Sequence, residues 1–209
     1  MNARENRKKE TVQRILDASA HIFAEVGFEG ARVDEIATRA GVNKAMIYYH
    51  IGDKKALYTR VLHAVFGDTA SRMAKNIARA ETPLQKMKAY VRSIGEALEK
   101  HPHLPPIMMR EMAGGGANLP EVVAEELASI IEMIRDVLTE GQRQGHFAKV
   151  EPLILHVMVV GGISFFKTSS PARKKYFEQL GETAESVEGK EGLDLRTEIE
   201  NIVLRAVLK

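Results

Sequence analysis

Apolar residues recur at three- and four-residue steps along almost the whole of this 209-residue chain. Such spacing places them on one face of an α-helix, whereas a half-buried strand needs strict alternation, which no segment shows convincingly. Glycine and proline interrupt the pattern at intervals, as they do between helices. The sequence therefore predicts an all-α fold, because each apolar stripe has to be buried against another helix.

The interruptions divide the chain into a series of predicted helices. A first helix ends at Gly27 and a second, shorter one ends at Gly41. A third begins at Lys44, and Asp53 is expected to cap a fourth. Further helices are expected over residues 82–100, 107–112, 120–144, 152–166, 171–180 and 193–208, with a proline-rich break over residues 101–106.

Composition and charge exclude several classes of protein. The chain has no cysteine, which rules out disulfides and thiolate chemistry and fits a cytoplasmic location. No signal-peptide core follows the polar N-terminus, and the longest apolar run, Pro152 to Phe166, is shorter than the roughly 20 residues that a membrane span takes. Residues 1–60 hold 11 basic side chains against 8 acidic ones. This excess is compatible with binding of phosphates.

The stretch from Val33 to His50 is the most informative part of the sequence. Two short apolar stripes are separated there by Gly41, which supplies the positive φ of a tight turn, and by Asn43, a typical N-cap. Ala37 is small where the second of the two helices would cross the first. Two helices joined in this way form a helix-turn-helix, whose second helix presents its exposed face to the DNA major groove.

This stretch resembles the N-terminal region of the tetracycline-repressor (TetR) family. The likeness covers residues 11 to about 60, and it rests on Phe23, Gly27, Ile36-Ala37, Ala40-Gly41-Val42, Ile47-Tyr48-Tyr49-His50, Lys54 and Leu57. It implies a three-helix DNA-binding domain at residues 1–54, followed by a larger helical domain for ligand binding and dimerisation at residues 55–209.

The resemblance also implies which side chains touch DNA. Lys44 and Ala45 match positions that face the major groove. Tyr48 and His50 match positions that usually contact the phosphate backbone. Lys54 matches a lysine that usually holds a phosphate. Double-stranded DNA is therefore the expected partner.

The chain departs from the family pattern just before the second helix. Family members usually carry a threonine or serine there, which caps the helix and binds phosphate. Here Arg32 precedes Val33, so the cap is lost and Arg32 is expected to serve the phosphate instead. Asp34 is assigned no contact, because a carboxylate repels phosphate. Tyr49 completes the predicted DNA-binding set and is expected to be at least partly in the core.

Two helices late in the chain indicate a homodimer. The predicted helix at residues 152–166 is apolar all round, so it is expected to be buried on every side, and Gly161-Gly162 would let another backbone approach closely. The resemblance pairs this helix and the last one with their mates in a four-helix bundle. The alternative is a central helix of a monomer. A dimer would present two recognition helices to a palindromic operator.

The middle of the chain is expected to sense a small molecule. The resemblance implies an inducer pocket over residues 82–144, for which Phe66, Tyr90, Met109 and Ile134 are predicted wall residues, and the methionines of this region suit an irregular cavity. The predicted function is a ligand-responsive transcriptional regulator, a repressor that a small, largely apolar molecule releases from its operator.

Two other classes of protein remain open. In an enzyme, Gly114-Gly115-Gly116 would be a poor phosphate loop, because it lacks the following lysine and the preceding strand. His101 and His103 form an incomplete metal site. No catalytic residue, metal or cofactor is therefore expected. In the second class, the same DNA-binding domain precedes a body that binds a protein partner and no small molecule.

Overall fold

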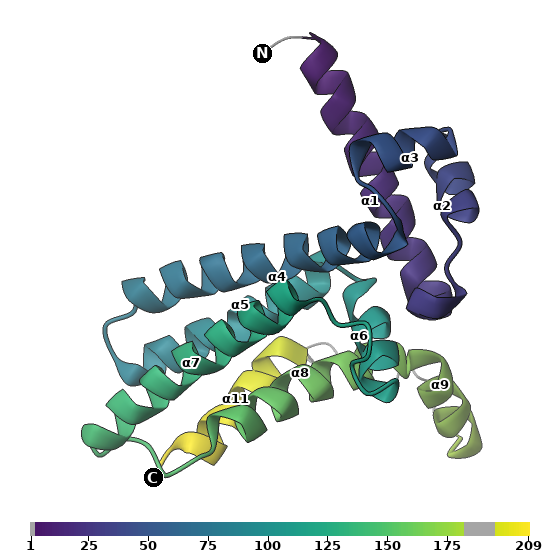
Figure 1. Cartoon of the computed structure of the whole chain (residues 1–209). Coiled ribbons are helices and arrows are strands. Elements are labelled where there is room, and N and C mark those ends of the chain that lie inside the picture. The colour runs from purple at the N-terminus through teal and green to yellow at the C-terminus, as the bar shows by residue number, and fades with distance from the viewer. Residues whose placement is uncertain (1–2, 182–194) are drawn as a thin grey trace. The chain divides into compact units, whose positions relative to one another are not determined.

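The computed structural model describes residues 3–181 and 195–209, and it confirms the all-α prediction (Figure 1). Extended backbone within these ranges amounts to one isolated bridge, between Phe147 and Leu208. The helices are α1 (Ala3–Gly30), α2 (Val33–Ala40), α3 (Lys44–His50), α4 (Lys54–Arg79), α5 (Pro83–Lys100), α6 (Leu104–Ala113), α7 (Glu121–Arg143), α8 (Pro152–Thr168), α9 (Ser170–Gln179) and α11 (Leu195–Val207).

Contacts between the helices divide the chain into two compact units. The first unit comprises Met1–Gly67 and His101–Glu125, and the second comprises Asp68–Lys100 and Glu126–Lys209. The first unit thus contains α6, which follows α3 by more than fifty residues in the sequence. The division into functional domains at residue 54, which falls at the first residue of α4, stays a prediction.

The first unit is built on the long helix α1. This helix contacts α2 and α6, and α2 contacts α3. The apolar stripe predicted for the first helix supplies the core, since Ile15, Ile22 and Phe23 are buried. Side chains from the following helices, Ile36, Ile47 and Leu57 among them, close this core.

One predicted helix boundary is confirmed and another is wrong. Gly27 interrupts the first helix as predicted: it adopts φ 72° and ψ −178°, outside the helical region, and a short helical segment continues beyond the kink to Gly30. The helix expected at 107–112 begins earlier, at Leu104, inside the expected break. Pro105 and Pro106 do not prevent this, because they lie in the first turn of α6, where backbone N–H groups need no acceptor within the helix.

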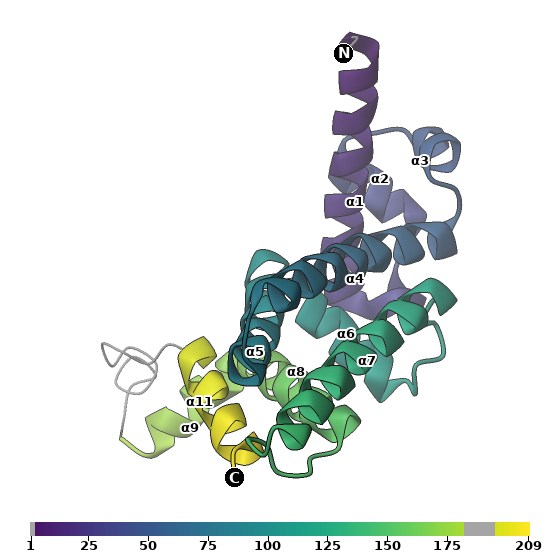
Figure 2. The same cartoon turned by 90° about the vertical axis from the view of Figure 1, so that its left-hand side faces the viewer.

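The second unit packs α5 against α8 and α11, and α8 against α11 (Figure 2). Its core includes Tyr90, Leu155 and Val203. Ion pairs link the helices at their edges: Lys86 of α5 reaches Glu140 of α7 at 2.6 Å. Arg92 of α5 reaches the buried Glu200 of α11 at 2.7 Å.

The expectation that the late apolar helix is buried on every side is wrong for the single chain. One face of α8 is buried in the second unit, through Leu155, Val159 and Ile163. The opposite face is exposed and apolar, and it carries Leu153, Ile154, Val157, Met158 and Phe165. Uniform hydrophobicity of a helix does not show how many of its faces one chain can cover.

No single helix in residues 3–181 and 195–209 is long and apolar enough to cross a membrane. Only α8 and α9 taken together pass by length and composition, and they are bent by 68° at the break between them.

Candidate DNA interface

The turn between α2 and α3 has the geometry that its sequence predicts. Gly41 lies in the left-handed region, at φ 63° and ψ 40°, and its N–H donates to the carbonyls of Ala37 and Thr38. The side chain of Asn43 accepts a hydrogen bond of 2.9 Å from the backbone N–H of Ala45. It therefore satisfies one of the amides that the start of a helix leaves open. Both the positive φ at Gly41 and the cap at Asn43 are confirmed.

A small core fixes how α3 is rotated. Ile36 and Ala37 of α2 and Ile47 of α3 are buried. Because Ile47 faces the core, the residues on the other side of this short helix face outward. Lys44, Ala45, Met46, Tyr48 and Tyr49 are all exposed.

Two tyrosines dominate the exposed face of α3. Tyr48 is 50% exposed and Tyr49 is 79% exposed. The expectation that Tyr49 is partly core is therefore wrong, because Ile47 already fills the only inward position of this turn of helix. An exposed phenol combines an apolar ring with a hydroxyl group, which suits contacts with sugars, phosphates and base edges.

The lysine at the start of α3 is held by an acidic side chain of α2. Lys44 Nζ lies 2.9 Å from Asp34 Oδ2, and both side chains are substantially exposed. The hydrogen bond that Lys44 donates to Asp34 holds the pKa of Lys44 above its ordinary value. Asp34 thus ties α2 to α3, and it also offsets a positive charge on the face that would meet DNA.

Three further predicted DNA-binding residues differ in their contacts within the protein. Lys54 donates to the carbonyl of Glu29 at 3.3 Å, and its ammonium group lies 4.5 Å from the centroid of the Phe28 ring. His50 Nδ1 is buried and makes no hydrogen bond within the described residues. Arg32 is the exposed N-cap residue of α2, and it makes no side-chain capping bond. The phosphate contacts of these residues stay predictions.

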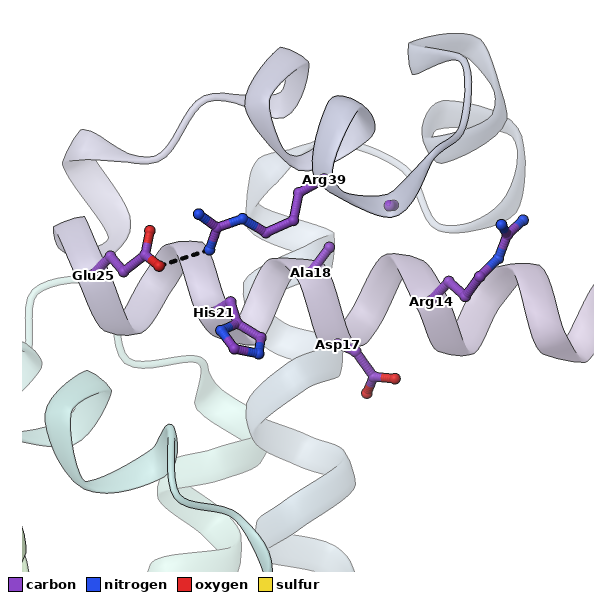
Figure 3. A pocket seen from close by; sticks show the side chains of 7 residues that line it. Arg14, Asp17, Ala18, His21, Glu25 and Arg39 are labelled. Carbon is purple, nitrogen blue, oxygen red and sulfur yellow. Dashed lines mark hydrogen bonds and ion pairs between the residues drawn. The ribbon is translucent and has the colours of Figure 1, made fainter.

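A polar pocket that the sequence analysis missed lies between α1 and α2 (Figure 3). It has a volume of about 520 Å³ and is lined by Arg14, Asp17, Ala18, His21, Glu25, Arg39 and Ala40. Arg39 bonds Glu25 at 2.7 Å, and this hydrogen bond lowers the pKa of Glu25. The four-residue spacing of Asp17, His21 and Glu25 marks one face of α1 and could have indicated the pocket.

His103, one of the two histidines considered as a metal site, packs against a histidine of α1. The ring of His103 packs on that of His21, with 3.8 Å between ring centroids. Burial, and then the neighbouring His21, lower the pKa of His103. Within the described residues, no group of three or more histidine, cysteine, aspartate or glutamate side chains is arranged to hold a metal ion.

Two family models match the chain. The model described as "Bacterial regulatory proteins, tetR family" matches residues 15–61. The model described as "Tetracyclin repressor-like, C-terminal domain" matches residues 83–191, more than half of the chain. The chain belongs to the TetR family. The family resemblance drawn from residues 11–60 is thereby confirmed and extends through most of the chain.

Relatives of this TetR-family chain include two regulators of known name. The HTH-type transcriptional regulator RutR of Escherichia coli is 27% identical over 157 residues, which cover 75% of this chain and 74% of RutR. The HTH-type transcriptional repressor NicS of Pseudomonas putida is 26% identical over 163 residues, or 77% and 76% of the two chains. A crystal structure of FadR from Bacillus subtilis in complex with stearoyl-CoA shares the fold, with a TM-score of 0.66 at 22% identity, and the match covers 93% of this chain and 96% of FadR.

The four residues proposed for the effector pocket lie in different surroundings. Tyr90 and Ile134 are buried in the second compact unit, where the hydroxyl group of Tyr90 lies 3.1 Å from Nδ1 of the buried His156. Phe66 is half-buried and Met109 is exposed, and both belong to the first unit. None of the four lines the pocket of Figure 3. Their contact with an effector stays a prediction.

Proposed function

We propose that this TetR-family protein is a homodimeric transcriptional repressor that binds a palindromic operator and is released from it by a small, largely apolar effector. The exposed face of α3 is the observation that carries the proposal. Its cap at Asn43 and the buried Ile47 hold the helix rigidly, while Lys44, Tyr48 and Tyr49 face outward. A rigid helix with an exposed basic and aromatic face is what recognition in the major groove requires.

The exposed apolar face of α8 supports the homodimer. Exposed apolar residues recur from Leu153 to Phe165, and a Cβ built on Gly161 meets no atom within 4 Å. Ile202 of the neighbouring α11 is also exposed. A contiguous apolar patch of this kind marks an interaction site. A second copy of the chain covers it best, because two-fold symmetry would supply the second recognition helix that a palindrome needs.

A largely apolar effector is supported by the relatives and by the composition of the body. FadR, which shares the fold, was crystallised with stearoyl-CoA. The core of the second unit consists of aliphatic residues together with Met73, Met87 and Tyr90. We expect the effector to bind best to a conformation in which the two recognition helices do not match the spacing of the half-sites. Effector binding then opposes DNA binding by linkage. Such a regulator acts where the DNA is, so the cytoplasmic location predicted from the sequence belongs to the same proposal.

The test begins with selection of DNA fragments by the full-length protein from a genomic or random pool, followed by titration of the selected site at fixed salt. We expect Tyr48→Ala to weaken binding about tenfold, because one well-placed contact of a recognition helix contributes on that scale. Tyr176→Ala is the matched control, since Tyr176 of α9 is also an exposed tyrosine (63%) and lies outside the first unit.

The two arms of the experiment have distinct outcomes. A selective complex that Tyr48→Ala weakens and Tyr176→Ala leaves intact supports recognition through α3. A wild-type protein that enriches no sequence contradicts the proposed function. A selective complex that is insensitive to Tyr48→Ala contradicts the role given to α3.

A further inference from the structure

Helix α6 belongs to the same compact unit as the helix-turn-helix. It lies far from α1–α3 in the sequence, and neither the sequence motif nor the family model at residues 15–61 includes it. In space it contacts α1 directly. Two adjacent side chains on α6, Arg110 and Glu111, make polar contacts with two different helices that support α3.

Arg110 holds the kinked end of α1. Its Nε donates to the carbonyl of Ala24 at 3.2 Å, and its Nη2 donates to the carbonyl of Glu25 at 2.9 Å. The positive φ of Gly27 interrupts the regular ladder of α1 just beyond these carbonyls, so they need donors from elsewhere. A guanidinium group supplies two N–H groups in a fixed fork, which matches two successive carbonyls.

Glu111 holds the start of α4. Its carboxylate is buried and accepts a 3.0 Å hydrogen bond from the hydroxyl group of Tyr58, and one of 2.6 Å from the backbone N–H of Asn118. The ring of Tyr58 packs against Phe23 and Phe28, at centroid distances of 4.9 and 5.0 Å. These two phenylalanines flank the kink at Gly27, so both contacts of α6 converge on one short segment of α1.

The same segment leads to α3. Lys54, at the first position of α4, bonds the carbonyl of Glu29 and lies over Phe28. Only residues 51–53 separate Lys54 from the end of α3. The contacts of α6 with both α1 and α4 therefore help to fix the position of α3 relative to α1.

We propose that Arg110 and Glu111 are positioning residues for operator recognition, which hold α1 and α4 at the relative angle that α3 needs to contact bases. The proposal rests on the proposed DNA-binding function. Neither side chain belongs to the exposed face of α3, so each acts through the helices that it holds. Loss of either contact misplaces α3 without removing any group that touches DNA.

The test compares the affinity for the selected operator with the affinity for non-specific DNA at one salt concentration. For Arg110→Ala we expect operator affinity to fall about tenfold with little change in non-specific affinity, because charge-assisted hydrogen bonds are lost while the phosphate-binding groups remain. Arg110→Lys keeps one donor group and recovers part of the loss. Circular dichroism shows whether each variant is fully folded at the assay temperature.

Matched variants separate positioning from simpler effects. Arg135→Ala removes another exposed arginine, on α7, and is expected to leave the ratio of the two affinities unchanged. Tyr58→Phe removes the hydrogen bond to Glu111, and Glu111→Gln removes the carboxylate charge that strengthens it. Together they should weaken operator binding by less than the product of their separate effects.

Several results would overturn the proposal. One is a folded Arg110→Ala variant whose operator affinity stays within twofold of the wild type. Another is an equal loss of operator and non-specific affinity, since it would make Arg110 an ordinary phosphate contact. If Arg110→Ala does not fold, the operator and non-specific affinities of Arg110→Lys are compared with those of the wild type in the same way. A wild-type protein that selects no operator overturns the proposed function and this proposal together, whereas a selective wild type that Arg110 variants match overturns only this proposal.

Discussion

At the scale of single residues, the ion pair between Asp34 and Lys44 sets the charge of the face that we propose for DNA binding. The two groups lie 2.9 Å apart and are both exposed, so the pair contributes little to folding. Its consequence is for binding. The carboxylate repels phosphates and occupies the ammonium group of Lys44 in the free protein. We therefore expect the ion pair to lower operator affinity while it fixes the orientation of Lys44.

We expect Asp34→Asn to tighten operator binding about threefold to tenfold at low salt, because one like-charge repulsion is removed and Lys44 is released. The gain should shrink as salt is raised. Fluorescence anisotropy titrations at several salt concentrations measure both effects. Asp136→Asn, which removes another exposed carboxylate, on α7, controls for net charge. Weaker binding by Asp34→Asn would mean that orientation of Lys44 outweighs the repulsion.

A second prediction concerns the buried pair Tyr90 and His156. Burial lowers the pKa of His156, because the charged imidazolium loses its hydration. The unfolded chain then takes up a proton more readily than the folded one. The stability that this histidine contributes is complete above about pH 6.5 and is lost as the pH falls toward its lowered pKa, with a slope of at most about 1.4 kcal/mol per pH unit.

Urea unfolding between pH 7.5 and pH 5 checks this prediction. We expect His156→Gln to have a smaller decrease in stability with falling pH than the wild type. His146→Gln, at another exposed histidine, is the matched control for the loss of one histidine. Identical curves for the wild type and His156→Gln would refute the assignment.

At the scale of elements, α3 is too short to be stable by itself. It has seven residues, whereas isolated helices in water need about 12–15. Its stability comes from the cap at Asn43, the turn at Gly41 and the burial of Ile47. Local side-chain chemistry thus holds the helix that we propose for DNA recognition.

We expect Asn43→Ala to lower the free energy of unfolding by about 1 kcal/mol, the usual contribution of a side-chain N-cap. Asn43→Ser should retain most of it, because the hydroxyl group can still accept from the backbone of α3. Asn201→Ala, at an exposed position within α11, is the matched control. Denaturant titration measures all three variants, and equal stability of Asn43→Ala and the wild type would show that the cap is dispensable.

At the scale of the whole molecule, the exposed face of α8 predicts self-association. Met158 is 64% exposed at the centre of this face. We expect Met158→Glu to give a folded monomer, because a carboxylate buried against the apolar face of a second copy is strongly unfavourable. Light scattering after size exclusion measures the mass, and the operator titration should show the accompanying loss of tight binding.

Met112→Glu is the control for this prediction. Met112 of α6 is 51% exposed and lies in the other compact unit, so the same substitution there should leave the oligomeric state unchanged. A Met158→Glu protein that elutes and scatters like the wild-type dimer would contradict a dimer through α8. A monomeric wild type would contradict the dimer itself.

The sequence by itself determined the helix-turn-helix, because its requirements are local. The positive φ at Gly41, the cap at Asn43 and the inward Ile47 all lie within eleven residues of Ala37, so spacing alone could indicate them. The same is true of the all-α fold, since each apolar stripe is read along one helix. Proline position misled the prediction of α6, because a proline has opposite meanings in the first turn of a helix and in its interior.

Only the tertiary structure decided which helix covers each apolar or polar face. Periodicity shows that a helix has a face to bury, but it does not identify the partner. Tyr58 and Glu111 are 53 positions apart, and nothing in their local sequence pairs them. Local spacing likewise does not encode contacts between distant segments. Four findings depend on such contacts: one face of α8 is exposed, Tyr49 is exposed, Lys54 bonds Glu29, and α6 lies beside α1.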